Sequence, residues 1–126
     1  MISKLSIKNL NFGYHNKRIL KDFFMNVNDG QIVSIVGPNG SGKSTLIKCI
    51  DRILIPSTGD VTVDRCNTGK MGRLEIAKKI AYVPQSALRV FPNTVFDVVL
   101  MGRRPYLSWK GDRSDEEKVW EVLRLL

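Results

Sequence analysis

The ten-residue segment VGPNGSGKST, residues 36–45, decides the fold of this chain. It satisfies the pattern G-x-x-x-x-G-K-[ST], whose fixed positions are Gly37, Gly42, Lys43 and Ser44. An Ile- and Val-rich run at residues 31–37, QIVSIVG, precedes it and is typical of a central strand covered on both faces. Residues 43–54, KSTLIKCIDRIL, follow with apolar side chains at helical spacing. The sequence therefore predicts a phosphate-binding loop between a strand and a helix.

The glycines of this loop explain how it would hold a phosphate group. Without a Cβ atom at Gly37, Gly40 and Gly42, the backbone can wrap closely around an anion. Successive backbone N–H groups, those of Asn39 and Ser41 included, would then point inward at phosphate oxygens. The helix that begins near residue 43 would add the positive end of its dipole to the same site.

Three side chains that follow the glycines have expected roles toward a nucleotide. The ammonium group of Lys43 is expected to reach the β- and γ-phosphates. The hydroxyl of Ser44 is expected to ligate Mg²⁺, and Thr45 to contact the α-phosphate. A glycine turn without a ligand is the alternative, and the strand and helix around the pattern argue against it.

Short β-strands are predicted on both sides of the phosphate loop. Residues 2–7 alternate between apolar and polar side chains, and a turn at 13–17 separates them from a second strand at 18–27. After the helix, which Pro56 and Gly59 would end, further strands are expected at 59–64 and 80–85.

Three helices are expected in the later part of the chain. Residues 74–79 form a short one, and the next runs to Gly102 from an N-cap at Asn93 or Thr94. The last helix spans 114–126, where Ser114 and Glu117 fit a capping box. Its apolar face comprises Val119, Val122, Leu123 and Leu126.

Composition and charge limit the possible functions. The chain is 43% hydrophobic and 25% charged, as in an ordinary globular protein, and holds no apolar run long enough for a membrane-spanning helix. Cys49 and Cys66 are too few for a disulfide framework or a zinc site. The net charge of +8 comes from scattered Lys and Arg residues without interleaved aromatics, so we expect no specific nucleic-acid surface. The pair Arg103–Arg104 is expected to be solvated.

Several segments together resemble the ATPases of ATP-binding-cassette (ABC) transporters. GPNGSGKSTL at 37–46 resembles the Walker A segment of that family, and LNFGYHNKRIL at 10–20 resembles its opening. The resemblance implies that Tyr14 stacks on adenine, and an aromatic face over a purine is a reasonable clamp. The segment at 80–106 resembles the family's Q-loop region, which implies that Gln85 contacts Mg²⁺ and the region of the attacking water.

The resemblance covers the whole chain but only the first half of the family's domain. It implies an incomplete α/β domain with a P-loop NTPase core, an N-terminal antiparallel β subdomain and the start of a helical subdomain. The segments expected in this order are 1–30 (antiparallel β), 31–56 (Walker A strand, loop and helix), 57–92 (β region and Q-loop) and 93–126 (helical).

The resemblance also implies an activity, partners and a location. TVFDVVLMGRRPY, residues 94–106, is similar to importers of iron chelates, haem and cobalamin. The expected cofactors are ATP and Mg²⁺, and the expected partners are a membrane permease subunit and a second ATP-binding subunit. The expected location is the cytoplasm, peripheral to the inner face of the cell membrane.

The residues for ATP hydrolysis in that family have no counterpart in these 126 residues. No apolar strand ends in Asp-Glu, no LSGGQ motif occurs, and His15, the one histidine, lies far too early to be the family's late switch histidine. We therefore expect no catalytic residue in this chain and a fragment that binds Mg-ATP without turnover. The alternatives are a non-catalytic nucleotide-binding or interaction fragment, and another P-loop NTPase, such as a nucleotide kinase, a GTPase or a soluble ABC protein acting on nucleic acid.

Overall fold

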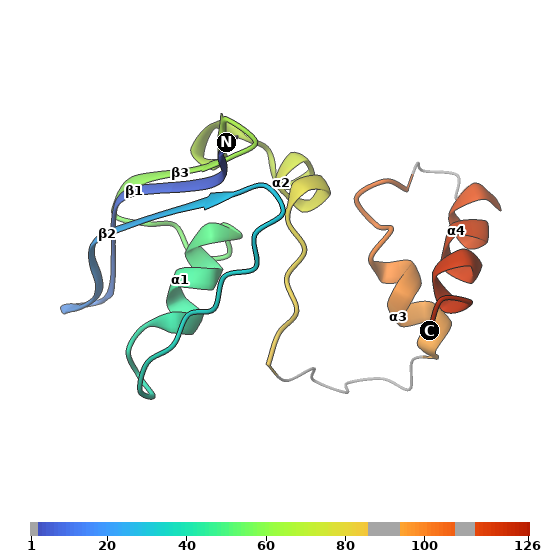
Figure 1. Cartoon of the computed structure of the whole chain (residues 1–126), viewed down its shortest axis with the longest axis horizontal. Coiled ribbons are helices and arrows are strands. Elements are labelled where there is room, and N and C mark those ends of the chain that lie inside the picture. The colour runs from blue at the N-terminus through green and yellow to red at the C-terminus, as the bar shows by residue number, and fades with distance from the viewer. Residues whose placement is uncertain (1–2, 86–93, 108–112) are drawn as a thin grey trace. The chain divides into compact units, whose positions relative to one another are not determined.

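The computed structural model describes residues 3–85, 94–107 and 113–126. The chain divides into two compact units, Met1–Ala81 and Tyr82–Leu126, which are drawn in Figure 1 and described separately below.

A four-stranded antiparallel sheet forms most of the first unit. Its strands are β1 (Ser3–Tyr14), β2 (Lys17–Asn28), β3 (Thr58–Val63) and β4 (Cys66–Asn67), in the spatial order β2-β1-β3-β4. The strands expected at 2–7, 18–27 and 59–64 are thus present, and the first two are longer than the sequence pattern indicated. The sheet confirms the antiparallel β region at the start of the chain.

A tight hairpin joins β1 to β2. Tyr14 pairs with Lys17, and Phe12 pairs with Leu20 one bulge further along. Gly13 is required here, because a Cβ atom on it would lie 2.6 Å from the carbonyl oxygen of Lys17. His15, at the tip, adopts a positive φ of 51°. The turn that the sequence placed at residues 13–17 is therefore confirmed.

Helix α1 (Lys43–Ile50) packs on one face of this sheet and closes the core. Leu46, Cys49 and Ile50 are its buried residues. They meet the inward side chains of the strands: Ile7, Leu10, Phe12, Leu20 and Val61. The helix ends earlier than expected, at the C-cap residue Asp51, so it stops well before Pro56.

Two of the expected strands are not formed among the described residues. Residues 31–38 and 80–84 carry no strand, and Ile32 and Val36 are 99% and 93% exposed. The pattern at 31–37 predicts a strand that is buried on both faces. A strand, however, exists only through hydrogen bonds to a neighbouring strand. The sheet of the described residues contains no partner for either segment.

A small 3₁₀ turn and a helix complete the first unit. The turn η1 (Thr68–Lys70) follows β4, and helix α2 (Arg73–Lys79) matches the short helix expected at 74–79. The Asp64 carboxylate lies in the β3–β4 turn and accepts from Lys4 of β1 at 2.7 Å and Lys79 of α2 at 2.9 Å. Asp64 thus links β1, the β3–β4 turn and α2 through two ion pairs.

The second unit contains helices α3 (Val95–Met101) and α4 (Arg113–Leu123). Thr94 caps α3 and exchanges hydrogen bonds with Asp97, which confirms one of the two expected caps. The other candidate, Asn93, lies outside the described residues. The predicted cap at Ser114 is wrong, because α4 begins at Arg113 and so contains Ser114 in its first turn.

The two helices of this unit share a small apolar contact. Val119 of α4 is buried, and the rings of Phe96 and Trp120 lie 5.1 Å apart. The rest of the predicted apolar face of α4 is largely exposed, as Val122 and Leu126 show.

Candidate nucleotide-binding site

The phosphate loop adopts the tight turn that its glycines permit. Gly40 and Gly42 have φ values of 80° and 95°, a region that favours glycine. The N–H of Ser41 donates to the carbonyl of Pro38 at 3.3 Å and closes the turn. A Cβ atom on Gly37 would lie 2.9 Å from the Ser41 hydroxyl, so a larger residue here would require that side chain to move. The backbone of residues 37–42 therefore curves as the sequence predicted.

The Lys43 side chain folds back across this loop. Its ammonium group donates to the carbonyl oxygens of Gly37 at 2.8 Å and Pro38 at 2.7 Å. The Ser41 hydroxyl lies 3.5 Å from the same nitrogen. A fixed positive charge is thus held at the loop, where an anion would bind.

The first turn of α1 offers backbone donors to that anion. Gly42 is the N-cap residue and has no side chain to cap the helix, and the first turn contains no acidic residue. Within the described residues, the N–H groups of Lys43, Ser44 and Thr45 have no hydrogen-bond acceptor. Unpaired N–H groups and the positive helix end favour an anion here. These residues therefore fit the phosphates of a nucleotide, and the Ser44 hydroxyl is exposed enough to meet a cation that accompanies them.

Tyr14 lies at the tip end of the hairpin that packs against the phosphate loop. A Cβ atom on Gly42 would be 3.0 Å from Ile19 and 3.3 Å from Leu20, both in β2. Tyr14 is 46% exposed, and its ring meets that of Phe12 at 4.9 Å and 87°. The structure thus joins the loop and the hairpin of Tyr14 in one unit. The sequence analysis did not identify the contact of Phe12 with Tyr14. The signal was present, because residues two positions apart in a strand point to the same face of the sheet.

Gln85 belongs to the second unit and is exposed. Its expected contact with Mg²⁺ stays a prediction. Among the described residues, no group of three or more His, Cys, Asp or Glu side chains could hold a metal ion.

Arg103 is partly buried in an ion pair, with 26% of its side chain exposed, and is not simply solvated as the sequence led us to expect. Its guanidinium group donates to the carboxylate of Asp115 and lies 4.5 Å from the ring of Tyr106. The partner carboxylate is twelve positions away in the sequence, so the residues next to Arg103 gave no sign of the pair. Arg104 remains exposed.

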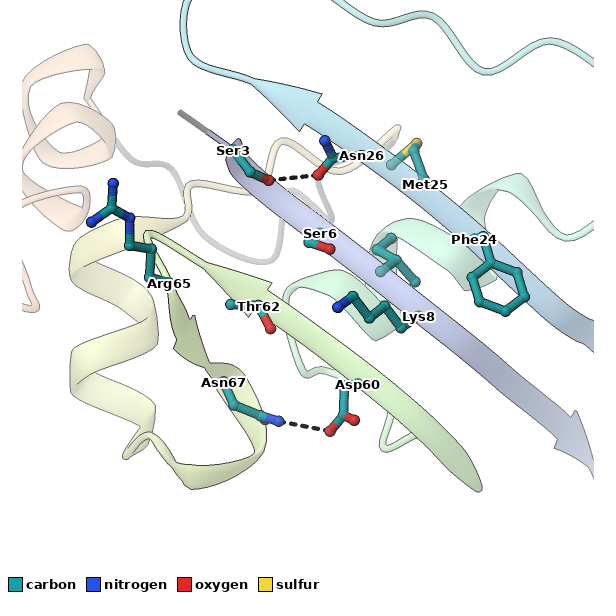
Figure 2. Close-up of a pocket in the computed structure, with 11 residues that line it drawn as sticks. Ser3, Ser6, Lys8, Phe24, Met25, Asn26, Asp60, Thr62, Arg65 and Asn67 are labelled. Atoms are coloured by element: carbon teal, nitrogen blue, oxygen red, sulfur yellow. Dashed lines mark hydrogen bonds between the residues drawn. The ribbon is translucent and has the colours of Figure 1, made fainter. Parts of the chain in front are cut away.

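A broad concavity lies on the face of the sheet opposite α1 (Figure 2). Polar side chains from β1 and β3 line it, with Phe24 of β2 at one side. Asn67 donates to Asp60, and Ser3 donates to Asn26 across it. None of the residues of the predicted nucleotide site lines this concavity.

These features define a P-loop NTPase fold: a glycine-rich turn, Lys43 folded back over that turn, and a helix without a side-chain cap, all beside an antiparallel β subdomain. The chain belongs to the ABC transporter family, whose members are ATPases, and residues 20–126 match it. None of the helices in the described ranges is long and apolar enough to cross a membrane.

Individual relatives agree with this family. The chain is 43% identical to an uncharacterized ABC transporter ATP-binding protein of Methanocaldococcus jannaschii, over 97% of this chain and 48% of the relative. It is 34% identical to the iron(3+)-hydroxamate import ATP-binding protein of Bacillus subtilis, over 93% of this chain and 44% of that protein. Other matched relatives are named for petrobactin, cobalamin and methionine import.

A solved structure of a nucleotide-free ATP-binding cassette from an ABC transporter superposes with a TM-score of 0.83 at 25% identity. The match covers 98% of this chain and 53% of that cassette. The chain therefore spans about half the length of the relatives that it matches.

Proposed function

We propose that this chain is the ATP-binding portion of an ABC importer ATPase, and that the intact protein energises uptake of a metal chelate. The phosphate loop carries the proposal: Lys43 lies across the loop, and the first turn of α1 leaves its N–H groups unpaired within the described residues. A nucleoside triphosphate would supply phosphate oxygens as acceptors for these N–H groups and for Lys43.

Each loop residue then has a role toward Mg-ATP. The backbone of residues 37–42 surrounds the β-phosphate, and Lys43 reaches the β- and γ-phosphates. The hydroxyl of Ser44 would ligate Mg²⁺, and Thr45 would contact the α-phosphate. The resemblance of residues 80–106 alone adds Gln85 as a further proposed contact of Mg²⁺. Mg²⁺ supplies charge neutralisation between the phosphates when it is bound. Tyr14 stacks on the adenine ring.

Binding without turnover is the expected behaviour of this chain. Hydrolysis needs a group that orients or deprotonates the attacking water. The one Asp-Glu pair in the sequence is Asp115-Glu116, and it lies in the first turn of α4, where Asp115 is paired with Arg103. It does not follow an apolar strand, so it does not supply that group.

Import of a metal chelate is supported by two observations. Residues 94–106 resemble importers of this kind, and one relative is named for iron(3+)-hydroxamate import. The proposal includes a membrane permease and a second ATP-binding subunit as partners, at the inner face of the cell membrane. A non-catalytic interaction module is the competing function, and it predicts no dependence of binding on Lys43.

Calorimetric titration of the 126-residue chain with Mg-ATP tests the proposal. Lys43→Ala should weaken binding by about 10- to 100-fold, because a charge-assisted hydrogen bond to phosphate is lost. Lys48→Ala is the matched control in the last turn of the same helix and should bind as the unaltered chain does.

Phosphate release is measured on the same samples. We expect no turnover above background in either variant or in the unaltered chain. Absence of ATP binding, or equal binding by the Lys43→Ala variant, would contradict the nucleotide site. Rapid hydrolysis that Lys43→Ala abolishes would contradict the claim that the catalytic residues are absent.

A further inference from the structure

Phe12 lies between the exposed ring of Tyr14 and the core of the first unit. Only 8% of Phe12 is exposed, whereas 46% of Tyr14 is. The two rings meet almost perpendicularly, at 87° with centroids 4.9 Å apart. Such an edge-to-face pair is favoured by the aromatic quadrupoles. Because Phe12 is held by the core, it is the fixed partner of the pair, and Tyr14 is the one whose orientation it limits.

Phe12 is also linked to the phosphate loop. It pairs with Leu20 across the hairpin, and the Leu20 side chain lies 3.3 Å from the position of a Cβ atom on Gly42. Leu46 and Ile50 of α1 belong to the same core as Phe12. One set of packed residues therefore runs from the aromatic ring at the hairpin to the start of the helix that would hold the phosphates.

We propose that Phe12 is a positioning residue for nucleotide binding, which holds the Tyr14 ring at a fixed orientation relative to the phosphate loop. This rests on the proposed function, since it needs ATP in the loop and adenine against Tyr14. Beside this contact the Tyr14 residue is 46% exposed, so part of it is accessible to a purine.

The physical benefit of this arrangement is preorganisation. An exposed tyrosine on a hairpin loses side-chain freedom when a base stacks on it, and that loss weakens binding. A ring already fixed by Phe12 loses less. Removal of Phe12 should therefore weaken the adenine contact by about two- to tenfold, the range of a single aromatic pair. Contacts to the triphosphate should be unaffected.

A double-mutant cycle tests this role. Phe12→Leu, Tyr14→Ala and the double variant of the 126-residue chain are titrated with Mg-ATP and, separately, with Mg²⁺ and inorganic triphosphate. Leucine keeps position 12 apolar, and Phe23→Leu is the matched control, since Phe23 packs against the same core and pairs with Leu10 instead. If Phe12→Leu does not fold, Phe12→Ile replaces it in the same cycle.

The expected result is non-additivity for ATP alone. Phe12→Leu should weaken ATP binding about two- to tenfold in the presence of Tyr14 and not in its absence. Triphosphate binding should be equal in all variants, and Phe23→Leu should change neither ligand.

Additive losses in the cycle, or equal losses for ATP and triphosphate, would overturn the role of Phe12. The same holds if Phe23→Leu weakens ATP binding as much as Phe12→Leu does. A failure of the proposed function looks different, because the unaltered chain would then fail to bind ATP, or Lys43→Ala would leave binding unchanged.

Discussion

The guanidinium group of Arg103 holds a single carboxylate oxygen of Asp115 through two of its nitrogens, at 2.8 and 2.7 Å. Asp115 is only 5% exposed. The pair joins the turn after α3 to the first turn of α4, and the ring of Tyr106 covers the guanidinium group. A buried carboxylate of this kind depends on its partner, because its removal from water is otherwise uncompensated.

Arg103→Met should therefore destabilise the second unit by about 2–4 kcal/mol, since it leaves a buried charge unpaired. Both tryptophans, Trp109 and Trp120, belong to that unit, so urea unfolding followed by tryptophan fluorescence measures it directly. Arg104→Met, at the exposed neighbouring position, should stay within about 0.5 kcal/mol of the unaltered chain. Equal effects of the two substitutions would show that the pair does not stabilise the unit.

Gly59→Ala should severely destabilise the first unit. Gly59 has a φ of 94°, and a Cβ atom on it would collide with the carbonyl group of Asn9 in the adjacent strand. We expect a loss of about 3 kcal/mol in the free energy of unfolding. Gly30→Ala is the control, with a similar φ of 73° but no atom within 4 Å, and it should cost about 1 kcal/mol. Hydrogen exchange of the β1 and β3 amides measures the difference: protection should fall more in Gly59→Ala than in Gly30→Ala. Similar protection in both variants would contradict the steric argument.

The ion pairs of Asp64 predict a dependence of stability on pH. Hydrogen bonds from Lys4 and then Lys79 hold the pKa of Asp64 below its usual value of 3.8. A carboxyl with a lowered pKa stabilises the fold above its unfolded-state value, and this contribution is lost as the pH falls through the lowered value. Thermal unfolding should therefore shift to lower temperature below pH of about 4.

Asp64→Asn should remove part of this acid dependence and lower the stability at neutral pH. Asp60→Asn serves as the control, because its amide oxygen can still accept from Asn67. If the unfolding temperature of the Asp64→Asn variant falls with pH as it does in the unaltered chain, the acid dependence does not come from Asp64.

Ser44→Ala should reduce the gain in ATP affinity that Mg²⁺ provides. We expect that gain to fall by about tenfold, or about 1.4 kcal/mol, because one oxygen ligand of the cation is lost. Titrations with ATP in the presence of Mg²⁺ or of a chelator measure it. Ser57→Ala, also exposed in the first unit, should leave the gain unchanged. A Mg²⁺ effect that survives Ser44→Ala would remove Ser44 from the proposed metal site.

Local sequence patterns predicted the hairpin, the helices and the phosphate loop, because each depends on neighbouring residues. Gly13 and Gly42 have conformations or close contacts that only glycine tolerates. Gly42 is a fixed position of the phosphate-loop motif, and Gly13 lies in the predicted hairpin turn. The strands expected at 31–37 and 80–85 failed for the opposite reason. The apolar composition of 31–37 indicated a buried strand and that of 80–85 indicated a strand, but pairing depends on distant segments that composition does not specify.

The candidate site was predicted to a similar extent. The glycines and the lysine of the loop follow from one motif, whereas the contact of Tyr14 with Phe12 depends on the orientation of two side chains that lie two positions apart in β1. The pairing of Arg103 with Asp115 joins residues twelve positions apart in different segments, and no pattern within either segment predicts it.

Exposure of the run at residues 31–36 has a consequence for how the protein behaves in solution. Ile32 and Val36 present apolar surface, and backbone without a strand partner among the described residues can pair with another copy. The net charge of +8 keeps copies apart, but salt screens that repulsion without weakening apolar burial. Added salt should thus make this basic chain self-associate, whereas it would dissolve a complex held together by charge.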